Sequence, residues 1–169
     1  MKNSVRNLSL FISILIVASF GYAGEVTKIE LEQLDGKWEG DGSFLLPGVH
    51  TTVSIDGKAT FKYDKKTKKL RTSLSGDKFM FTYNDSGYLY INPVTDSVSW
   101  EVWDNRNKHA LYYGIRKDNL ITGERMRGDE LYELVIDQVA TDTIEFKLLI
   151  TTPEKKVYNK AVFNLWRVK

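Results

Sequence analysis

Cysteine is absent from this chain of 169 residues, and histidine occurs only twice, as His50 and His109. Without cysteine the protein can form no disulfide, no thiolate metal site and no cysteine nucleophile. A Ser-His-Asp triad would depend on one of the two imidazoles, and neither G-x-S-x-G nor H-E-x-x-H accompanies them. The sequence therefore predicts no metal site, no cofactor and no catalytic residue, and it favours a non-catalytic protein over an enzyme.

An excess of positive or negative charge is also absent from the chain if residues 1–23 are left out of the count. Residues 1–23 have the features of a secretory signal, namely Lys2 and Arg6 at the start, the apolar run Leu8–Phe20, and the small residues Gly21 and Ala23 at the end. This run of 13 residues is shorter than a membrane-spanning helix. We expect cleavage after Ala23 and export to the periplasm or the outside of the cell, with no integral membrane segment after cleavage.

The remaining residues, 24–169, are predicted to form a single domain. Of the 24 basic and 22 acidic residues of the whole chain, the signal holds two bases and no acid, so the 146 residues that remain carry 22 of each sign. A balanced chain gives no support to a nucleic-acid partner. Its length suffices for one domain with a sizeable core.

One short helix is predicted before a long series of strands. Thr27 and Glu30 have the spacing of a capping box, and Gly36 is a typical stop for the helix. From Gly36 onward the chain alternates apolar and polar residues with period two, and turn residues such as those at 84–87 interrupt the pattern. The predicted strands are 38–46, 49–63, 70–75, 78–83, 88–91, 97–103, 108–115, 120–126, 131–139, 143–151 and 157–168.

Short connections between the predicted strands determine the fold class. They leave no room for crossover helices, so the sheet has to be antiparallel with neighbouring strands paired in chain order. A Greek-key sandwich would need long crossing connections, and the sequence has none. We therefore predict an all-β protein, an antiparallel meander β-barrel of about ten strands with one short N-terminal helix.

Two motifs give the sequence a family resemblance. The first strand carries G-x-W-x-G-x-G at Gly36–Gly42, directly after the helix, and the last strand ends with Leu165, Trp166 and Arg167. This combination resembles the calycin barrels, which include lipocalins, fatty-acid-binding proteins and nitrobindin-like proteins. The resemblance implies that Trp38 closes the floor of the barrel and that Arg167 packs across its ring. Such a cation–π contact stabilises by roughly 0.5–2 kcal/mol.

The resemblance also raises haem as an alternative. Nitrobindin-like barrels hold haem through a histidine near the C-terminal strand, but residues 157–169 contain no histidine, and Asn159–Ala161 occupy the expected place. Tyr158 or His109 would have to substitute as the iron ligand. A haem-binding or nitrogen-oxide-handling enzyme is therefore the alternative function, and this departure argues against it.

The leading prediction is a barrel that binds a small apolar or amphipathic ligand in its interior. Aromatic side chains provide large contact areas in such sites. The predicted lining residues are Phe61, Phe79, Phe81, Trp100 and Tyr113. A further alternative is an interaction module whose barrel is filled by its own side chains.

Arg125 is the predicted polar residue of the ligand site. Fatty-acid-binding barrels hold a ligand carboxylate with arginines and a tyrosine, and Arg125 with Tyr113 or Tyr132 would imitate this arrangement. In the alternative interpretation Arg125 faces solvent and pairs with Glu133 across neighbouring strands.

Overall fold

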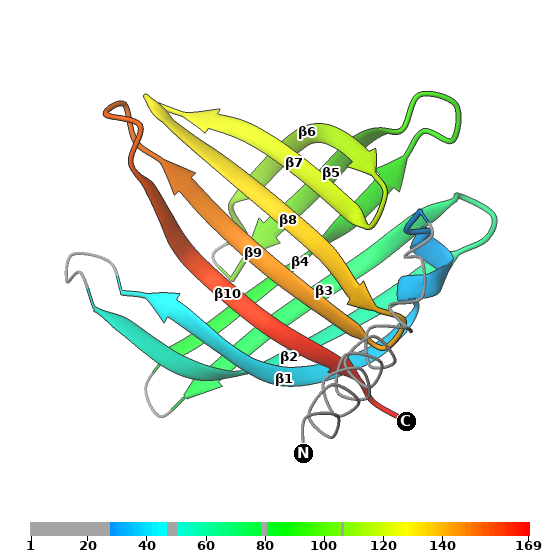
Figure 1. Ribbon diagram of the computed structural model, residues 1–169, viewed down its shortest axis with the longest axis horizontal. Coiled ribbons are helices and arrows are strands. Elements are labelled where there is room, and N and C mark those ends of the chain that lie inside the picture. The colour runs from blue at the N-terminus through cyan, green and yellow to red at the C-terminus, as the bar shows by residue number, and fades with distance from the viewer. Residues whose placement is uncertain (1–27, 47–50, 79–80, 106) are drawn as a thin grey trace, which may run out of the picture.

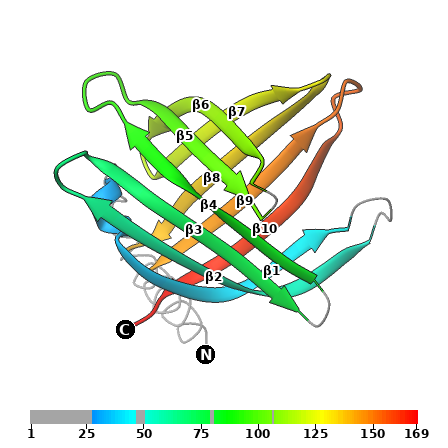
Figure 2. The same cartoon turned by 180° about the vertical axis from the view of Figure 1, so that it is seen from behind.

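Ten antiparallel strands close into a barrel in the computed structural model, which describes residues 28–46, 51–78, 81–105 and 107–169. Each strand pairs with the next one in the chain, and β1 pairs with β10 (Figures 1 and 2). The predicted all-β meander barrel is thereby confirmed. The strands are β1 (Gly36–Leu45), β2 (Thr52–Asp64), β3 (Lys69–Lys78), β4 (Phe81–Ile91), β5 (Ser97–Asp104), β6 (His109–Lys117), β7 (Leu120–Arg127), β8 (Glu130–Ala140), β9 (Thr143–Thr151) and β10 (Val157–Arg167).

The alternation of the sequence places one face of each strand inside the barrel. In β2, Ile55, Ala59 and Phe61 are buried, whereas the intervening Lys58 and Thr60 are exposed. Apolar side chains from the other strands fill the same half of the barrel. They include Leu70, Leu89, Ile121, Ile136, Ile144, Phe163 and Leu165. The core therefore lies toward the end of the barrel at which β1 begins.

The predicted N-terminal helix is a single 3-10 turn, η1 (Leu31–Leu34). Its N-cap residue is Glu30, whose backbone N–H donates to the Gln33 side chain at 3.1 Å. The predicted cap, Thr27, lies outside the described residues. Since β1 starts at Gly36, the chain has no room here for a longer helix. Within the described ranges, no helix is long and apolar enough to cross a membrane.

Strand β4 also differs from the prediction, because residues 84–87 form its middle and not a turn. They pair with β3 throughout, and Asp85 to Gly87 also pair with β5. Gly87 has a packing role at this point. A Cβ atom on Gly87 would lie 1.9 Å from the carbonyl oxygen of Glu101 in β5. Gly87 thus permits β4 and β5 to approach closely. A sequence interpretation that assigns residues 84–87 to a turn cannot predict this contact.

The barrel closes where the first and last strands meet. Trp38 lies opposite Arg167 in the β1–β10 pair, and the guanidinium carbon of Arg167 is 4.3 Å from the centre of the Trp38 ring. The Trp38 indole is fully buried and its Nε1–H donates to the carbonyl of Leu34 at 3.0 Å. Arg167 also donates to the carbonyls of Gln33 and Asp35. One arginine thus fastens η1 to the closing strands.

A second arginine fastens the segment before η1. Arg116 is 7% exposed and pairs with Glu30 at 2.6 Å and Asp96 at 2.7 Å, while its Nη1–H donates to the carbonyl of Ile29 at 3.1 Å. The hydrogen bond from Lys28, and then that from Arg116, hold the pKa of Asp96 below its usual range. This network holds the segment before η1 against β6 and the start of β5.

Candidate functional site

The opposite end of the barrel contains a cavity of about 400 Å³. This volume falls in the range of small-molecule sites. Apolar and aromatic side chains from five strands form much of its wall. They are Phe44, Val102, Ala110, Tyr112, Tyr132 and Leu148. We refer to this space as the mouth cavity.

Basic side chains outnumber acidic ones around the mouth cavity. The basic ones are Lys108, His109, Arg125, Arg127 and Lys160, and the acidic ones are Asp85 and Asp104. In the part of the chain that the structure describes, no ion pair joins Arg125 or Lys160 to a carboxylate. Low-dielectric walls concentrate the field of such charges, so the cavity is suited to an anionic group.

Arg125 lies between two tyrosine rings inside the barrel. Its guanidinium carbon is 5.1 Å from the centre of the Tyr112 ring and 5.5 Å from that of Tyr132. Arg127 lies over the Tyr132 ring too, at 5.9 Å. The Nε atom of Arg125 is buried and has no hydrogen-bond partner among the described residues. Stacking therefore restrains the guanidinium while leaving a buried donor unsatisfied.

Both tyrosines beside Arg125 keep their protons at neutral pH. Burial raises the pKa of Tyr112, and the nearby Arg125 opposes this effect without cancelling it. Burial also raises the pKa of Tyr132, whose hydroxyl donates to Glu130 at 3.0 Å. Tyr112 is 5% exposed. The site thus combines a guanidinium with a neutral phenol, the two kinds of donor that suit a carboxylate.

Lys160 reaches the cavity because β10 contains a bulge. The β9–β10 register shifts between Asn159 and Ala161, so Lys160 is the extra residue. Bulges redirect side chains in this way, often beside functional sites. The Lys160 Nζ donates to the carbonyl of Leu45 at 2.8 Å and lies 4.8 Å from the centre of the Phe44 ring. Burial lowers the pKa of Lys160.

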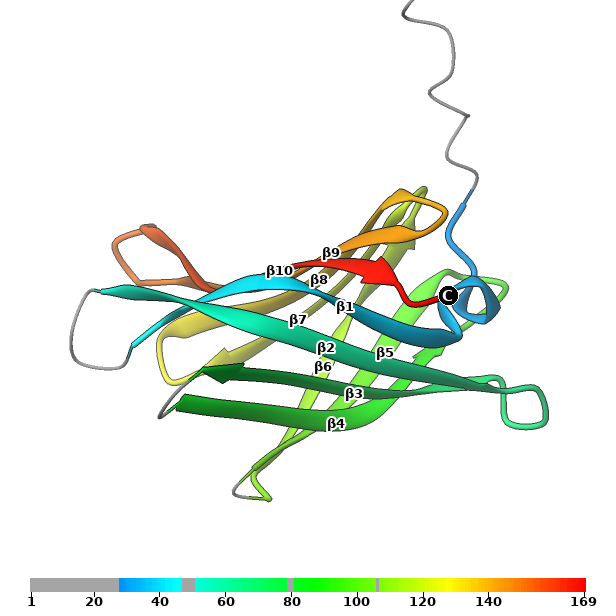
Figure 3. The ribbon, with the colours of Figure 1, turned by 90° about the horizontal axis from the view of Figure 1, so that it is seen from below.

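The barrel wall is split beside the cavity, between β6 and β7. Three residue pairs join these strands, namely Tyr113 with Glu124, Arg116 with Ile121 and Lys117 with Leu120, and residues 110–112 and 125–127 form no such pairs. The two ribbons diverge toward this end of the barrel (Figures 1 and 3). Tyr112 on β6 and Arg125 on β7 both line the mouth cavity at this place, and their stacked side chains span the gap between the two strands.

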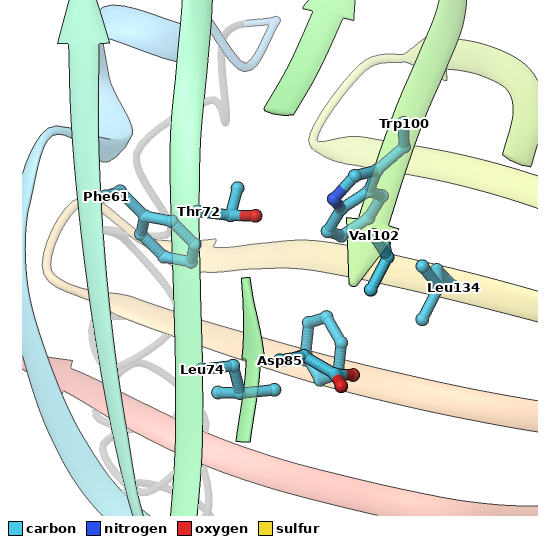
Figure 4. A pocket seen from close by; sticks show the side chains of 8 residues that line it. Phe61, Thr72, Leu74, Asp85, Trp100, Val102 and Leu134 are labelled. Carbon is cyan, nitrogen blue, oxygen red and sulfur yellow. The ribbon is translucent and has the colours of Figure 1, made fainter. Parts of the chain in front are cut away.

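A small void of about 20 Å³ lies deeper in the barrel. Phe61 and Trp100, two of the predicted ligand-site residues, line it together with Asp85 and Val102, which also line the mouth cavity. Figure 4 shows the indole nitrogen of Trp100 directed toward the side of Thr72. This nitrogen is buried without a partner among the described residues. The void has room for about one water molecule, so the deep half of the barrel is essentially filled.

Tyr113 does not line either space, contrary to the prediction. Its side chain is 63% exposed, because it lies on the outer face opposite Glu124. Its neighbour Tyr112 points inward instead. Phe79 and the side chain of Phe81, also predicted to line the ligand site, lie outside the described residues.

The surface pairing of Arg125 with Glu133 is not formed. Arg125 lies opposite Tyr132 inside the barrel, whereas Glu133 lies opposite Glu124 on the outer face. Burial, and then the charge of Glu124, raise the pKa of Glu133. The sequence interpretation also missed Tyr112 and Lys160. The alternation of β6 contains a signal for Tyr112, but nothing in the sequence shows the bulge that turns Lys160 inward.

The described residues do not fit a haem held by an axial imidazole inside the barrel. His109 is exposed at the rim, and its ring stacks on Trp103 with 4.9 Å between ring centres. At the place expected for the ligand in β10, Lys160 is engaged with the Leu45 carbonyl. Tyr158 is 37% exposed. The described residues also contain no cluster of histidine, aspartate or glutamate that could hold a metal ion.

Solved structures with the same architecture include a protein of unknown function from the DUF3598 family of Nostoc punctiforme PCC 73102, with a TM-score of 0.53 and 11% identity. The match covers 84% of this chain and 50% of that protein, so this chain spans about half its length. Rv2717c from M. tuberculosis has a TM-score of 0.60 and 14% identity, with 82% of this chain and 95% of that one covered.

A third similar structure is the S-type phycobiliprotein lyase CPES from Guillardia theta. Its TM-score is 0.56 at 14% identity, and the match covers 82% of this chain and 90% of that one. No family model matches the chain, and a search of curated proteins finds no relative. At these identities the similarity shows the fold alone, so the chain is a closed antiparallel barrel similar in fold to lipocalin-like barrels of the phycobiliprotein lyase and DUF3598 type.

Proposed function

We propose that the protein binds a small amphipathic ligand in the mouth cavity, with an acidic group of the ligand on Arg125, and that it catalyses no reaction. The observation that carries this proposal is the stacked guanidinium of Arg125 with its unsatisfied, buried Nε–H. A buried donor without a partner costs about 1–3 kcal/mol, and a carboxylate that accepts from it would remove this cost. The neutral phenol of Tyr112 supplies a second donor.

The apolar part of the ligand would lie against Phe44, Val102 and Leu148. These side chains are only partly buried, so a ligand that covers them removes apolar surface from water. The deep void is too small for an alkyl chain, which limits the ligand to the mouth cavity. This division of polar and apolar walls supports an amphipathic ligand over a purely apolar one.

The fold comparison supports a role for the cavity in a second way. One of the similar structures is named a phycobiliprotein lyase, so a barrel of this type has been adapted to a specific task in that protein. A barrel that serves only as an interaction module would not need an open cavity with a half-buried arginine. The calycin resemblance, with Trp38 and Arg167 at the closed end, belongs to the same proposal.

Export is a further part of the proposal. It is supported by the basic start of the sequence and by the apolar run at residues 8–20. A barrel outside the cytoplasm would meet its ligand in the periplasm or the surrounding medium.

The proposal is tested by titrating the protein with decanoate, a simple amphipathic carboxylate, in an isothermal calorimeter. Hydrogen bonds to charged groups contribute about 1.5–3 kcal/mol, so Arg125→Gln should weaken binding by roughly 10- to 150-fold. Arg71→Gln is the matched control, because Arg71 is exposed on the outer face of β3. Equal affinities of both variants would contradict the assignment of Arg125. Absence of saturable binding to the wild-type protein would favour the interaction module.

A further inference from the structure

The mouth cavity is also lined by Lys160, which carries a primary amine. The binding of a carboxylate to Arg125 does not involve this amine. Its side chain enters the cavity through a bulge in β10, a local irregularity that regular pairing does not require. Bulges that redirect a single side chain are frequent beside functional sites. The position of Lys160 is therefore a reason to ask what an amine can do there.

The amine of Lys160 is held without a counter-ion. No carboxylate lies within ion-pair distance of it among the described residues, and its contact is the carbonyl of Leu45 at 2.8 Å. A neutral amine can donate one hydrogen to this carbonyl and still have its lone pair available. The carbonyl thus restrains the nitrogen without blocking it as a nucleophile.

The surroundings make the neutral amine accessible. The Phe44 ring, 4.8 Å from the nitrogen, favours the ammonium form, but burial opposes it and the net effect lowers the pKa of Lys160. The other charged or titratable side chains around the cavity are Asp85, Asp104, Lys108, His109, Tyr112, Arg125, Arg127 and Tyr132. Among the charged ones, cations are in excess. Desolvation is one of the conditions that activate lysine as a nucleophile.

We propose that Lys160 forms an imine with the aldehyde group of an amphipathic ligand bound in the mouth cavity. The nitrogen attacks the carbonyl carbon and a C=N bond replaces the C=O bond. The nitrogen loses its two hydrogens, which leave with the carbonyl oxygen as water. No atom is oxidised or reduced, so the step needs no further reactant. This inference rests on the proposed function, since it places the ligand in the same cavity.

The experiment is reductive trapping with decanal and sodium cyanoborohydride, followed by peptide mapping by mass spectrometry. Lys160 should gain a decyl group about tenfold or more faster than surface lysines, which are largely protonated. Lys160→Arg should abolish the preferred label because a guanidinium forms no such imine. Lys62→Arg, which changes an exposed lysine on the outer face of β2, should leave the label at Lys160 unchanged. Excess decanoate should slow labelling by competition for the cavity.

Even labelling over all lysines, or a rate unaffected by Lys160→Arg, would overturn the inference. Decanoate affinity of the same variants shows which proposal has failed. If Lys160→Arg still binds decanoate and the wild-type protein shows no preferred label, the imine inference alone is refuted. If the wild-type protein neither binds decanoate nor labels at Lys160, the proposed function fails with it.

Discussion

The contact between Arg167 and Trp38 gives the most quantitative prediction about the fold. Replacing Arg167 by alanine removes the cation–π contact, worth about 1 kcal/mol at a half-exposed site, together with two hydrogen bonds to the carbonyls of Gln33 and Asp35. At roughly 0.5–1.5 kcal/mol for each hydrogen bond, the free energy of unfolding should fall by about 2–4 kcal/mol.

Trp38→Ala should be more costly. The indole is fully buried and its removal leaves a cavity beneath η1, so we expect a loss of about 3–5 kcal/mol. The double variant should lose about 1 kcal/mol less than the two single losses combined, because both substitutions remove the same cation–π contact.

Urea unfolding followed by tryptophan fluorescence and circular dichroism measures these free energies. Arg71→Ala, an arginine on the outer face of β3, is the control and should change stability by less than about 0.5 kcal/mol. Additive losses in the double variant would refute the reasoning, since they would mean that the two side chains do not interact. Decanoate affinity of the folded Arg167→Ala protein should be unchanged, because this contact lies at the opposite end from the mouth cavity.

Two further predictions concern β4 and the start of the chain. Gly87→Ala should destabilise the protein by about 3 kcal/mol, because the added Cβ would collide with the Glu101 carbonyl. Gly128→Ala is the control and should cost only about 1 kcal/mol, because Gly128 has open space around it and only its φ of +62° disfavours alanine. Equal losses of stability in thermal unfolding would contradict the packing role of Gly87. Intact mass spectrometry of exported protein should show a chain that begins at Gly24, and soluble exported protein that retains residues 1–23 would contradict cleavage after Ala23.

The sequence predicts the barrel well because each strand leaves a local signal. Period-two alternation and short turns are properties of neighbouring residues, and closure follows because a meander of this length would otherwise leave two open edges. The break expected at residues 84–87 shows where such reasoning stops. Asn, Asp, Ser and Gly are typical of turns, but here Gly87 serves the close approach of β5, a contact between residues far apart in the chain.

The N-terminal helix is shorter than predicted for a similar reason. The spacing of Thr27 and Glu30 matches a capping box, but Arg116 in β6 and Asp118 in the turn after β6 bind the chain at Ile29 and Glu30. These contacts leave only the four residues of η1 before Gly36. Tertiary contacts thus determined the cap and the length of this turn, and local spacing contains no information about them.

Side-chain direction limited the prediction of the site. Arg125 could be assigned from sequence either to the cavity or to a surface pair with Glu133, and only the β7–β8 register decides between them. Tyr113 and Tyr112 are adjacent, so an error of one residue exchanges the cavity for the outer face. Lys160 depends on a bulge, which breaks the alternation on which such predictions are based.

The central claim is that Arg125 binds the acidic group of an amphipathic ligand, and paired ligands test it most directly. Calorimetric affinities of decanoate and decanol should be measured for the wild-type protein and for Arg125→Gln. The account predicts that the wild-type protein prefers decanoate by roughly 10-fold or more and that this preference disappears in Arg125→Gln, while decanol binds both proteins about equally. An equal preference for decanoate in the two proteins would contradict the claim, because the carboxylate would then be bound elsewhere.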